Sequence, residues 1–292
     1  MELHEAIIIR ALNPMLFQAL ALKAVRYALI SVPFTYNRME KSHILPRIEN
    51  IFKGKLAEEI FYHHCQSQHI RVDFESCSTP FWMPDQRDFL WLGGEWDLKN
   101  NFFYCTDEAF ENFDFTLLPA LIPNTYDHDQ WSKRNETLLY HSKFMAYVFS
   151  FMRLKPDKKA FFKISLDHRQ LDFIYRVIEQ YRNLPYSKMA SFETWFFQQL
   201  DFSETSDVLE IYYQPEMILT ACANTKYYHL FLNTSVNDDH YASLKDLPWY
   251  EKKDKVVRFL NGSLVTTIRN MTCPVGLLPS FSNVVMRTVT KV

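Results

Sequence analysis

The stretch DFLWLGGEWDLKNNFFYC, residues 88–105, decides the fold that this sequence predicts. Phe, Trp, Leu and Tyr are frequent around the pair Gly93-Gly94, and aromatic residues in particular favour β-strands. Two glycines between strand-forming runs are typical of a two-residue hairpin turn, because both turn positions need a positive φ. The stretch therefore predicts an antiparallel β-hairpin that turns at Gly93-Gly94.

The predicted hairpin gathers charged side chains on one face. Counting outward from the turn places Asp88 opposite Lys99, and Asp97 stands two residues before Lys99. Because side chains alternate along a strand, Asp88, Asp97 and Lys99 are expected to share a face, with cross-strand neighbours about 4.5–5.5 Å apart. Trp91 and Trp96 then point to the opposite face. Such an ion cluster is costly to desolvate unless something charged binds to it.

Helices and strands are predicted on both sides of this hairpin. A helix is predicted over residues 14–30, with Asn13 as its N-cap and Pro33 after its end. A second helix is predicted over residues 46–64 from its apolar stripe. The other predicted elements are strands at 69–77, 160–166, 208–213, 227–233 and 255–268, and helices at 127–152 and 169–183.

The order of these elements predicts three segments. Residues 1–45 are an N-terminal helical segment, and residues 46–185 are a core around the hairpin. Residues 186–292 are a mixed α/β, largely β extension, with substrate binding as its expected role. No linker rich in Gly, Pro or Ser separates the segments, so we expect them to share an interface.

The charged cluster of the hairpin suits metal-assisted hydrolysis of phosphodiesters. Carboxylates are the hard oxygen ligands that Mg²⁺ prefers, and a bound ion polarises a phosphoryl oxygen and lowers the pKa of an attacking water. The ammonium group of Lys99 can orient that water or offset the charge that builds on phosphorus. The alternative is an ordinary hairpin in which Asp88 and Lys99 form an ion pair on a solvated face.

The residues of the hairpin resemble the motif of the PD-(D/E)XK nuclease superfamily, the restriction-endonuclease-like family. That motif is an Asp, a spacer, then Asp or Glu, any residue, and Lys. In this chain it consists of Pro84-Asp85 or Asp88, followed by Asp97-Leu98-Lys99. The family also places a glutamate on a preceding helix, and this chain has Glu58 in the setting Gly54-Lys-Leu-Ala-Glu58.

Over roughly residues 46–183 the resemblance implies an αβββαβα core within an α/β (α+β) fold. It implies nuclease activity that depends on Mg²⁺ or Mn²⁺. The implied metal ligands are Glu58, Asp88 and Asp97, and Lys99 completes the implied catalytic set.

Three positions of this motif stay open. Asp85 is the aspartate of the literal Pro-Asp pair, but it has the opposite strand parity to Asp88, so Asp88 is preferred unless the chain bulges between them. On the helix the glycine spacing favours Glu58 over Glu59. Glu95 shares the charged face of the hairpin and is an alternative metal ligand to the hairpin aspartate or to the helix glutamate.

The composition excludes several classes of protein. Hydrophobic residues make up 48% of the chain and aromatic residues 16%, which is too much apolar surface for a disordered protein. The formal net charge of −2 provides no global basic field. Five cysteines without a Cys-x-x-Cys pair favour a reducing compartment. With an acidic N-terminus and no long uncharged apolar run, the chain is expected to be cytoplasmic and to have no membrane partner.

DNA is the expected partner, held through its phosphates by lysine and arginine side chains. The predicted function is an endonuclease of the restriction or mobile-element kind, with a homodimer or a partner protein completing the binding groove. The alternatives are an inactive nuclease-fold protein that binds nucleic acid or serves assembly, and a ribonuclease. Candidate phosphate contacts are Lys53, Lys55, Lys133, Arg134 and the run Lys252-Lys253-Asp254-Lys255.

Overall fold

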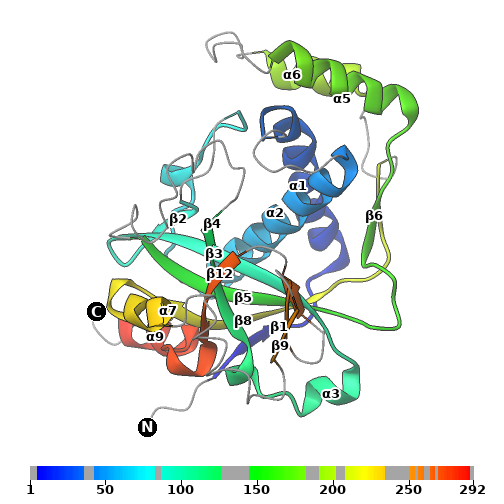
Figure 1. The fold of residues 1–292 in the computed structure, drawn as a ribbon. Coiled ribbons are helices and arrows are strands. Elements are labelled where there is room, and N and C mark those ends of the chain that lie inside the picture. The colour runs from blue at the N-terminus through cyan, green and yellow to red at the C-terminus, as the bar shows by residue number, and fades with distance from the viewer. Residues whose placement is uncertain are drawn as a thin grey trace.

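The protein has a mixed α/β fold built on a five-stranded mixed sheet (Figure 1). The predicted α+β class is confirmed at this level. The computed structural model describes residues 5–35, 43–82, 87–125, 145–181, 191–201, 208–233, 250–253, 256–259, 264–266 and 269–289.

The central sheet takes strands from all three predicted segments. In spatial order the strands are β1 (Ile7–Ile9), β8 (Glu216–Ala223), β5 (Met145–Leu154), β3 (Gly94–Tyr104) and β2 (Phe89–Trp91). Strands β3 and β5 are parallel, and the other neighbours are antiparallel. The predicted division at residues 45 and 185 stays a prediction about folding units.

The hairpin of β2 and β3 forms, but it turns one residue earlier than predicted. Phe89 pairs with Trp96, and the turn residues are Leu92 and Gly93, with φ values of 53° and 73°. Both angles are positive, as a two-residue turn that matches strand twist requires. The pairing shifts by two residues, an even number, so the predicted faces are kept.

Replacing Leu92 by asparagine is expected to stabilise the protein by about 0.5–1 kcal/mol, because asparagine adopts the left-handed region more readily than leucine. The Leu92 side chain is 51% exposed, so little packing is lost. Urea unfolding measures the change. Leu277→Asn is the matched control, because Leu277 is 58% exposed and is not among the described residues with positive φ. A stability gain at both positions would contradict the explanation by backbone strain.

Two long helices, α1 (Pro14–Thr35) and α2 (Ile44–Ser67), pack on one face of the sheet (Figure 1). The first begins as predicted, because Asn13 Oδ1 accepts a hydrogen bond from the backbone N–H of Met15 at 2.9 Å. It continues past Pro33, where an end was predicted. The residues around Pro33 are buried, and this packing offsets the hydrogen bond that proline cannot donate.

Two features bear on the predicted location. Among the residues that the structure describes, α1 is long and apolar enough to cross a membrane, yet half of its most apolar window is buried inside the fold. Core helices of soluble proteins and signal sequences both have these properties, so cytoplasmic localisation and the absence of a membrane partner stay predictions. The five cysteines are buried free thiols.

The helix predicted over residues 127–152 is wrong in its described part, which belongs to strand β5. Residues 145–154 form a strand between β3 and β8, and residues 126–144 lie outside the described part of the chain. A strand that is buried on both faces is apolar almost throughout, so its sequence lacks the alternation that marks a half-exposed strand.

Residues 69–77 were predicted as a strand, and this is wrong. Within them Asp73 makes an isolated bridge to Leu90, and a short 3₁₀ helix, η2 (Glu75–Cys77), follows. The carboxylate of Asp73 accepts a hydrogen bond from the backbone N–H of Ser76 at 2.9 Å. Such a local side-chain contact competes with strand pairing.

Residues 227–233 were also predicted as a strand, but they form helix α7 (Tyr228–Asn233). Asn224 Oδ1 accepts a hydrogen bond from the backbone N–H of Lys226, at 3.1 Å, and this contact starts the helical turn that leads into α7.

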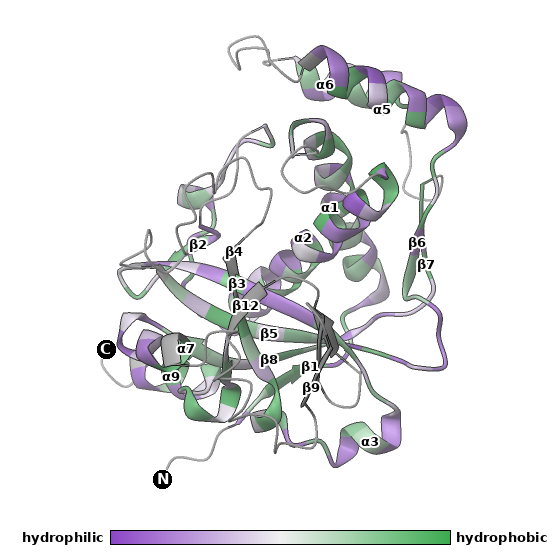
Figure 2. Ribbon diagram, in the orientation of Figure 1, coloured by the Kyte–Doolittle hydropathy of each residue, from purple (hydrophilic) through white to green (hydrophobic). Residues whose placement is uncertain are grey.

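Two buried cores lie on opposite faces of the sheet. Helices α1 and α2 cover one core, and the other is closed by α7 and by the paired strands β4 (Pro119–Thr125) and β12 (Arg269–Pro274). Figure 2 shows hydrophilic residues on β3 beside the hydrophobic strands β5 and β8. The remaining elements are α3 (Asp107–Glu111), η3 (Phe115–Leu117), β6 (Phe162–Ile164), α5 (His168–Tyr181), α6 (Phe192–Gln199), β7 (Leu209–Ile211), η6 (Thr225–Tyr227), β9 (Tyr250–Lys253), β10 (Val256–Phe259), β11 (Leu264–Thr266), η8 (Val275–Leu277) and α9 (Phe281–Val289).

Candidate active site

The motif residues of β3 lie on one face of the strand, as predicted. Lys99 Nζ forms an ion pair with Asp97 Oδ2 at 2.6 Å. Trp96 and Leu98, which alternate with them, are buried at 6% and 7% exposure. Alternation along the strand thus separates a charged face from an apolar one.

Asp88 reaches the same motif through a hydrogen bond to the backbone. It stands just before β2, where its own N–H donates to the carbonyl of Trp96 at 2.9 Å. Its Oδ2 accepts the N–H of Leu98 at 2.7 Å. The carboxylate therefore contacts the middle residue of Asp97-Leu98-Lys99. Strand alternation alone did not predict this contact, because Asp88 lies outside the regular ladder.

The environment of Asp88 disfavours its charged form. Burial is the largest cause that raises the pKa of this carboxyl group, and the neighbouring negative charges of Glu58 and Asp97 raise it further. The ammonium groups of Lys55 and Lys99 act in the opposite direction and do not cancel the effect. Asp88 is therefore a carboxylate that lacks sufficient compensating positive charge.

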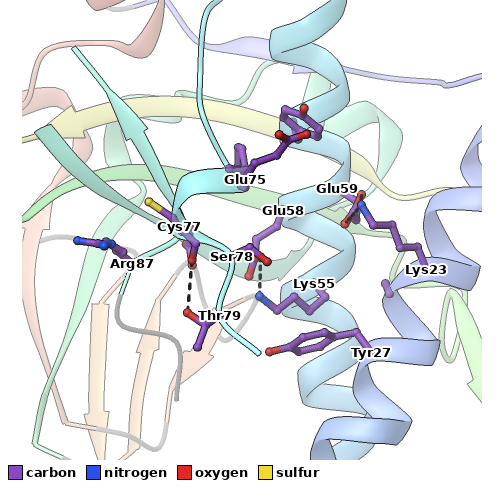
Figure 3. Close-up of a pocket in the computed structure, with 14 residues that line it drawn as sticks. Lys23, Tyr27, Lys55, Glu58, Glu59, Glu75, Cys77, Ser78, Thr79 and Arg87 are labelled. Carbon is purple, nitrogen blue, oxygen red and sulfur yellow. Dashed lines mark hydrogen bonds and ion pairs between the residues drawn. The ribbon is translucent and has the colours of Figure 1, made fainter. Parts of the chain in front are cut away.

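Helix α2 supplies the glutamate nearest to this centre. Glu58 forms an ion pair with Lys55 at 2.8 Å (Figure 3). Its negative charge raises the pKa of Asp88. Glu59 instead pairs with Lys23 of α1 at 2.8 Å. Of the two glutamates on α2, Glu58 is therefore the one whose charge acts on Asp88, whereas Glu59 is paired with α1.

The helix and the motif face approach Asp88 from opposite sides of the sheet. Leu98 packs in the same core as α2, so Asp97 and Lys99 lie on the other face of β3. Lys99 Nζ is 5.8 Å from the ring centroid of Tyr147, which belongs to the core on that other face. Asp88 stands at the edge strand β2, where charges from both sides act on it.

The donor set suits a hard divalent cation. In the described part of the chain, no three His, Cys, Asp or Glu side chains converge closely enough to hold an ion by themselves. Mg²⁺ commonly takes one or two protein carboxylates and completes its coordination with water and phosphate oxygens. Asp88 and Asp97 could supply these two carboxylates, with Glu58 reaching the ion through water.

A cavity of about 450 Å³ lies beside Asp88, between α1, α2 and the segment 74–79 (Figure 3). The predicted residues Glu58 and Asp88 both line it, as does Glu59. Tyr27 and Lys23 of α1 were not predicted as part of a site. Their spacing of four residues places both on one face of the helix, but such spacing alone does not indicate a site. The other lining residues are Ala24, Lys55, Tyr62, Phe74, Glu75, Cys77, Ser78, Thr79 and Arg87.

Two of the other predicted residues make contacts of their own outside this centre. Glu95 forms an ion pair with Arg87. Lys53 Nζ lies 5.5 Å from the ring centroids of Phe102 and Phe162. Lys252 and Lys253 belong to β9. Asp85, Lys133, Arg134, Asp254 and Lys255 lie outside the described residues.

The candidate site rests on its own contacts. Comparison with protein-family models, with curated proteins and with solved structures finds no match to this chain. The contacts that define the site are the bond from Leu98 N–H to Asp88 and the ion pairs of Glu58 and Asp97 with lysines.

Proposed function

We propose that this protein is a divalent-metal-dependent nuclease that hydrolyses phosphodiester bonds of DNA. The observation that carries the proposal is the hydrogen bond from Leu98 N–H to Asp88 Oδ2 at 2.7 Å. It joins an aspartate from one arm of a hairpin to the centre of an Asp-x-Lys motif on the other arm. A restriction-endonuclease-like αβββαβα core over residues 46–185 is part of the proposal, and the 186–292 extension is its substrate-binding part.

Each residue of the centre has a separate role. Asp88 and Asp97 would hold Mg²⁺ or Mn²⁺, and Glu58 would hold one of its waters. The ion would supply Lewis-acid activation of the phosphate and a water of lowered pKa. Lys99 Nζ, now bonded to Asp97, would orient the attacking water or offset charge on the phosphoryl oxygens.

The electrostatics of the free protein support a cation at this position. Lysines neutralise Glu58 and Asp97, while Asp88 is held by a backbone N–H and its pKa is raised by burial and by both carboxylates. A divalent cation would compensate these charges together. An ordinary surface ion pair does not explain why a third carboxylate lies half-buried beside two others.

The direct test is incubation of the purified protein with supercoiled plasmid, single-stranded circular DNA and RNA, each with Mg²⁺, Mn²⁺ or EDTA. We expect cleavage of DNA with either metal and none with EDTA. Faster cleavage of RNA than of both DNAs would favour a ribonuclease. Metal-independent binding without cleavage of any polymer would favour an inactive nucleic-acid-binding or assembly protein. Size-exclusion chromatography of the same sample tests whether a homodimer, rather than a partner protein, could complete the binding groove.

A further inference from the structure

The cavity beside Asp88 has the size of a pocket for one small organic group. Its volume of about 450 Å³ falls within the usual range of ligand pockets, about 300–1,000 Å³. Its walls come from α1, α2 and the segment 74–79, which are continuous with the protein core. A space of this size holds one small organic group and not a duplex end to end.

The chemistry of the walls suits a neutral, planar, hydrogen-bonding group. Tyr27, Tyr62 and Phe74 contribute aromatic surface, and Ser78 and Thr79 contribute hydroxyl groups. Nucleobases of any type stack on aromatic side chains, because every base has a π-face. Lys55 Nζ lies 4.6 Å from the ring centroid of Tyr27, and the rings of Tyr62 and Phe74 lie 4.9 Å apart. A nucleobase would therefore contact the parts of these half-buried rings that stay exposed, together with the Ser78 hydroxyl group.

The charges of the walls provide no net attraction for a bare phosphate. The lining contains four carboxylates and three cationic side chains, so it has a formal charge of −1 when all are ionised. Ion pairs also engage the cations: Lys23 pairs with Glu59, Lys55 with Glu58, and Arg87 with Glu95 outside the lining. A bare phosphate would therefore compete with these ion pairs, whereas a neutral base would not.

The position of the cavity links it to the proposed chemistry. Asp88 lines the cavity and also contacts the Asp97-Leu98-Lys99 motif. Asp88 stands at the sheet edge, between the cavity on the α2 side and the Asp97–Lys99 face on the other side. A phosphate held through a metal ion on Asp88 would therefore have its adjoining nucleoside beside the cavity. We infer that the cavity receives one unpaired nucleoside, and hence that the substrate is single-stranded or locally unpaired DNA. This inference rests on the proposed nuclease function.

The experiment compares fluorescein-labelled oligonucleotides: a single strand, a fully paired duplex, and that duplex with one bulged nucleotide. Anisotropy in Ca²⁺ measures binding, and Mg²⁺ reactions measure cleavage. We expect the single strand and the bulged duplex to bind at least 10-fold more tightly than the paired duplex. Tyr62→Leu, which removes one aromatic face, should weaken binding of the unpaired substrates about 10-fold and leave the paired duplex unchanged.

A second variant keeps the test valid if Tyr62→Leu does not fold. Ser78 is exposed at the cavity, so Ser78→Trp should obstruct it without disturbing the core, with the same loss of preference. The matched controls are Tyr175→Leu and Ser67→Trp, because both residues are exposed and do not line the cavity. Circular dichroism confirms the fold of each variant.

The outcomes separate this inference from the proposed function. Equal binding of paired and unpaired DNA, or pocket variants that behave like their controls, would overturn the nucleoside pocket even if the protein cleaves DNA. Failure to cleave any polymer would overturn the nuclease proposal, while the anisotropy measurements would still decide whether the cavity selects unpaired nucleotides.

Discussion

Replacing Lys99 by alanine is expected to lower metal-dependent DNA cleavage by about 100- to 1,000-fold, the usual cost of losing one group that stabilises transition-state charge. The side chains of Lys99 and Asp97 are 22% and 19% exposed, and their ion pair faces away from α2. A partly exposed pair of this kind adds only about 0–1 kcal/mol to stability. The variant should therefore fold and bind metal while losing turnover.

The rate is measured with excess protein over labelled DNA, and stability by urea unfolding. Lys163→Ala is the matched control, because Lys163 is an exposed lysine of the short strand β6. It removes the same charge from the protein at a site away from the hairpin. Equal cleavage by wild type and Lys99→Ala with both Mg²⁺ and Mn²⁺ would leave the ordinary ion pair as the better account of this hairpin.

The second large effect is expected when Asp88 is replaced by asparagine. The variant should be more stable than wild type without metal, and should gain less stability than wild type from Mg²⁺. Without metal, Asp88→Asn should raise the free energy of unfolding at pH 7 by about 1 kcal/mol, because it removes a half-buried charge between Glu58 and Asp97. The amide oxygen can still accept the hydrogen bond from Leu98 N–H. With Mg²⁺, wild type should gain stability through binding, and the variant should gain almost none.

The sign of the pH dependence follows from the raised pKa of Asp88. Between the ordinary pKa of an aspartate, about 3.9, and its raised value, the folded protein binds more protons than the unfolded chain. The contribution of Asp88 to stability therefore falls as pH rises through this window. The advantage of Asp88→Asn should be absent at low pH and complete above the raised pKa.

Thermal unfolding across pH, with Mg²⁺ and with EDTA, measures both effects. Asp172→Asn is the control, because Asp172 is an exposed aspartate of α5. An Asp88→Asn protein that is less stable than wild type in EDTA would contradict the interpretation of Asp88 as an uncompensated charge. Equal Mg²⁺ stabilisation of both proteins would remove Asp88 from the metal site.

Local patterns in the sequence determined the parts of this protein that depend on near neighbours. Asn13 capped a helix as expected, because the capping contact spans two residues. Asp97 and Lys99 share a face because strand alternation has a period of two. The turn lies at Leu92-Gly93 rather than at the predicted Gly93-Gly94. The faces are nevertheless as predicted, because the strand pairing differs from the prediction by two residues.

Only the tertiary structure decided which distant residues meet. It made residues 145–154 a central strand rather than a helix, because burial on both faces removes the alternation that a sequence can display. It placed Glu58 rather than Glu59 beside Asp88, because the rotation of α2 is set by its packing on α1 and the sheet. The cavity likewise exists only between elements far apart in sequence. Such packing depends on many long-range contacts at once, and no local pattern encodes it.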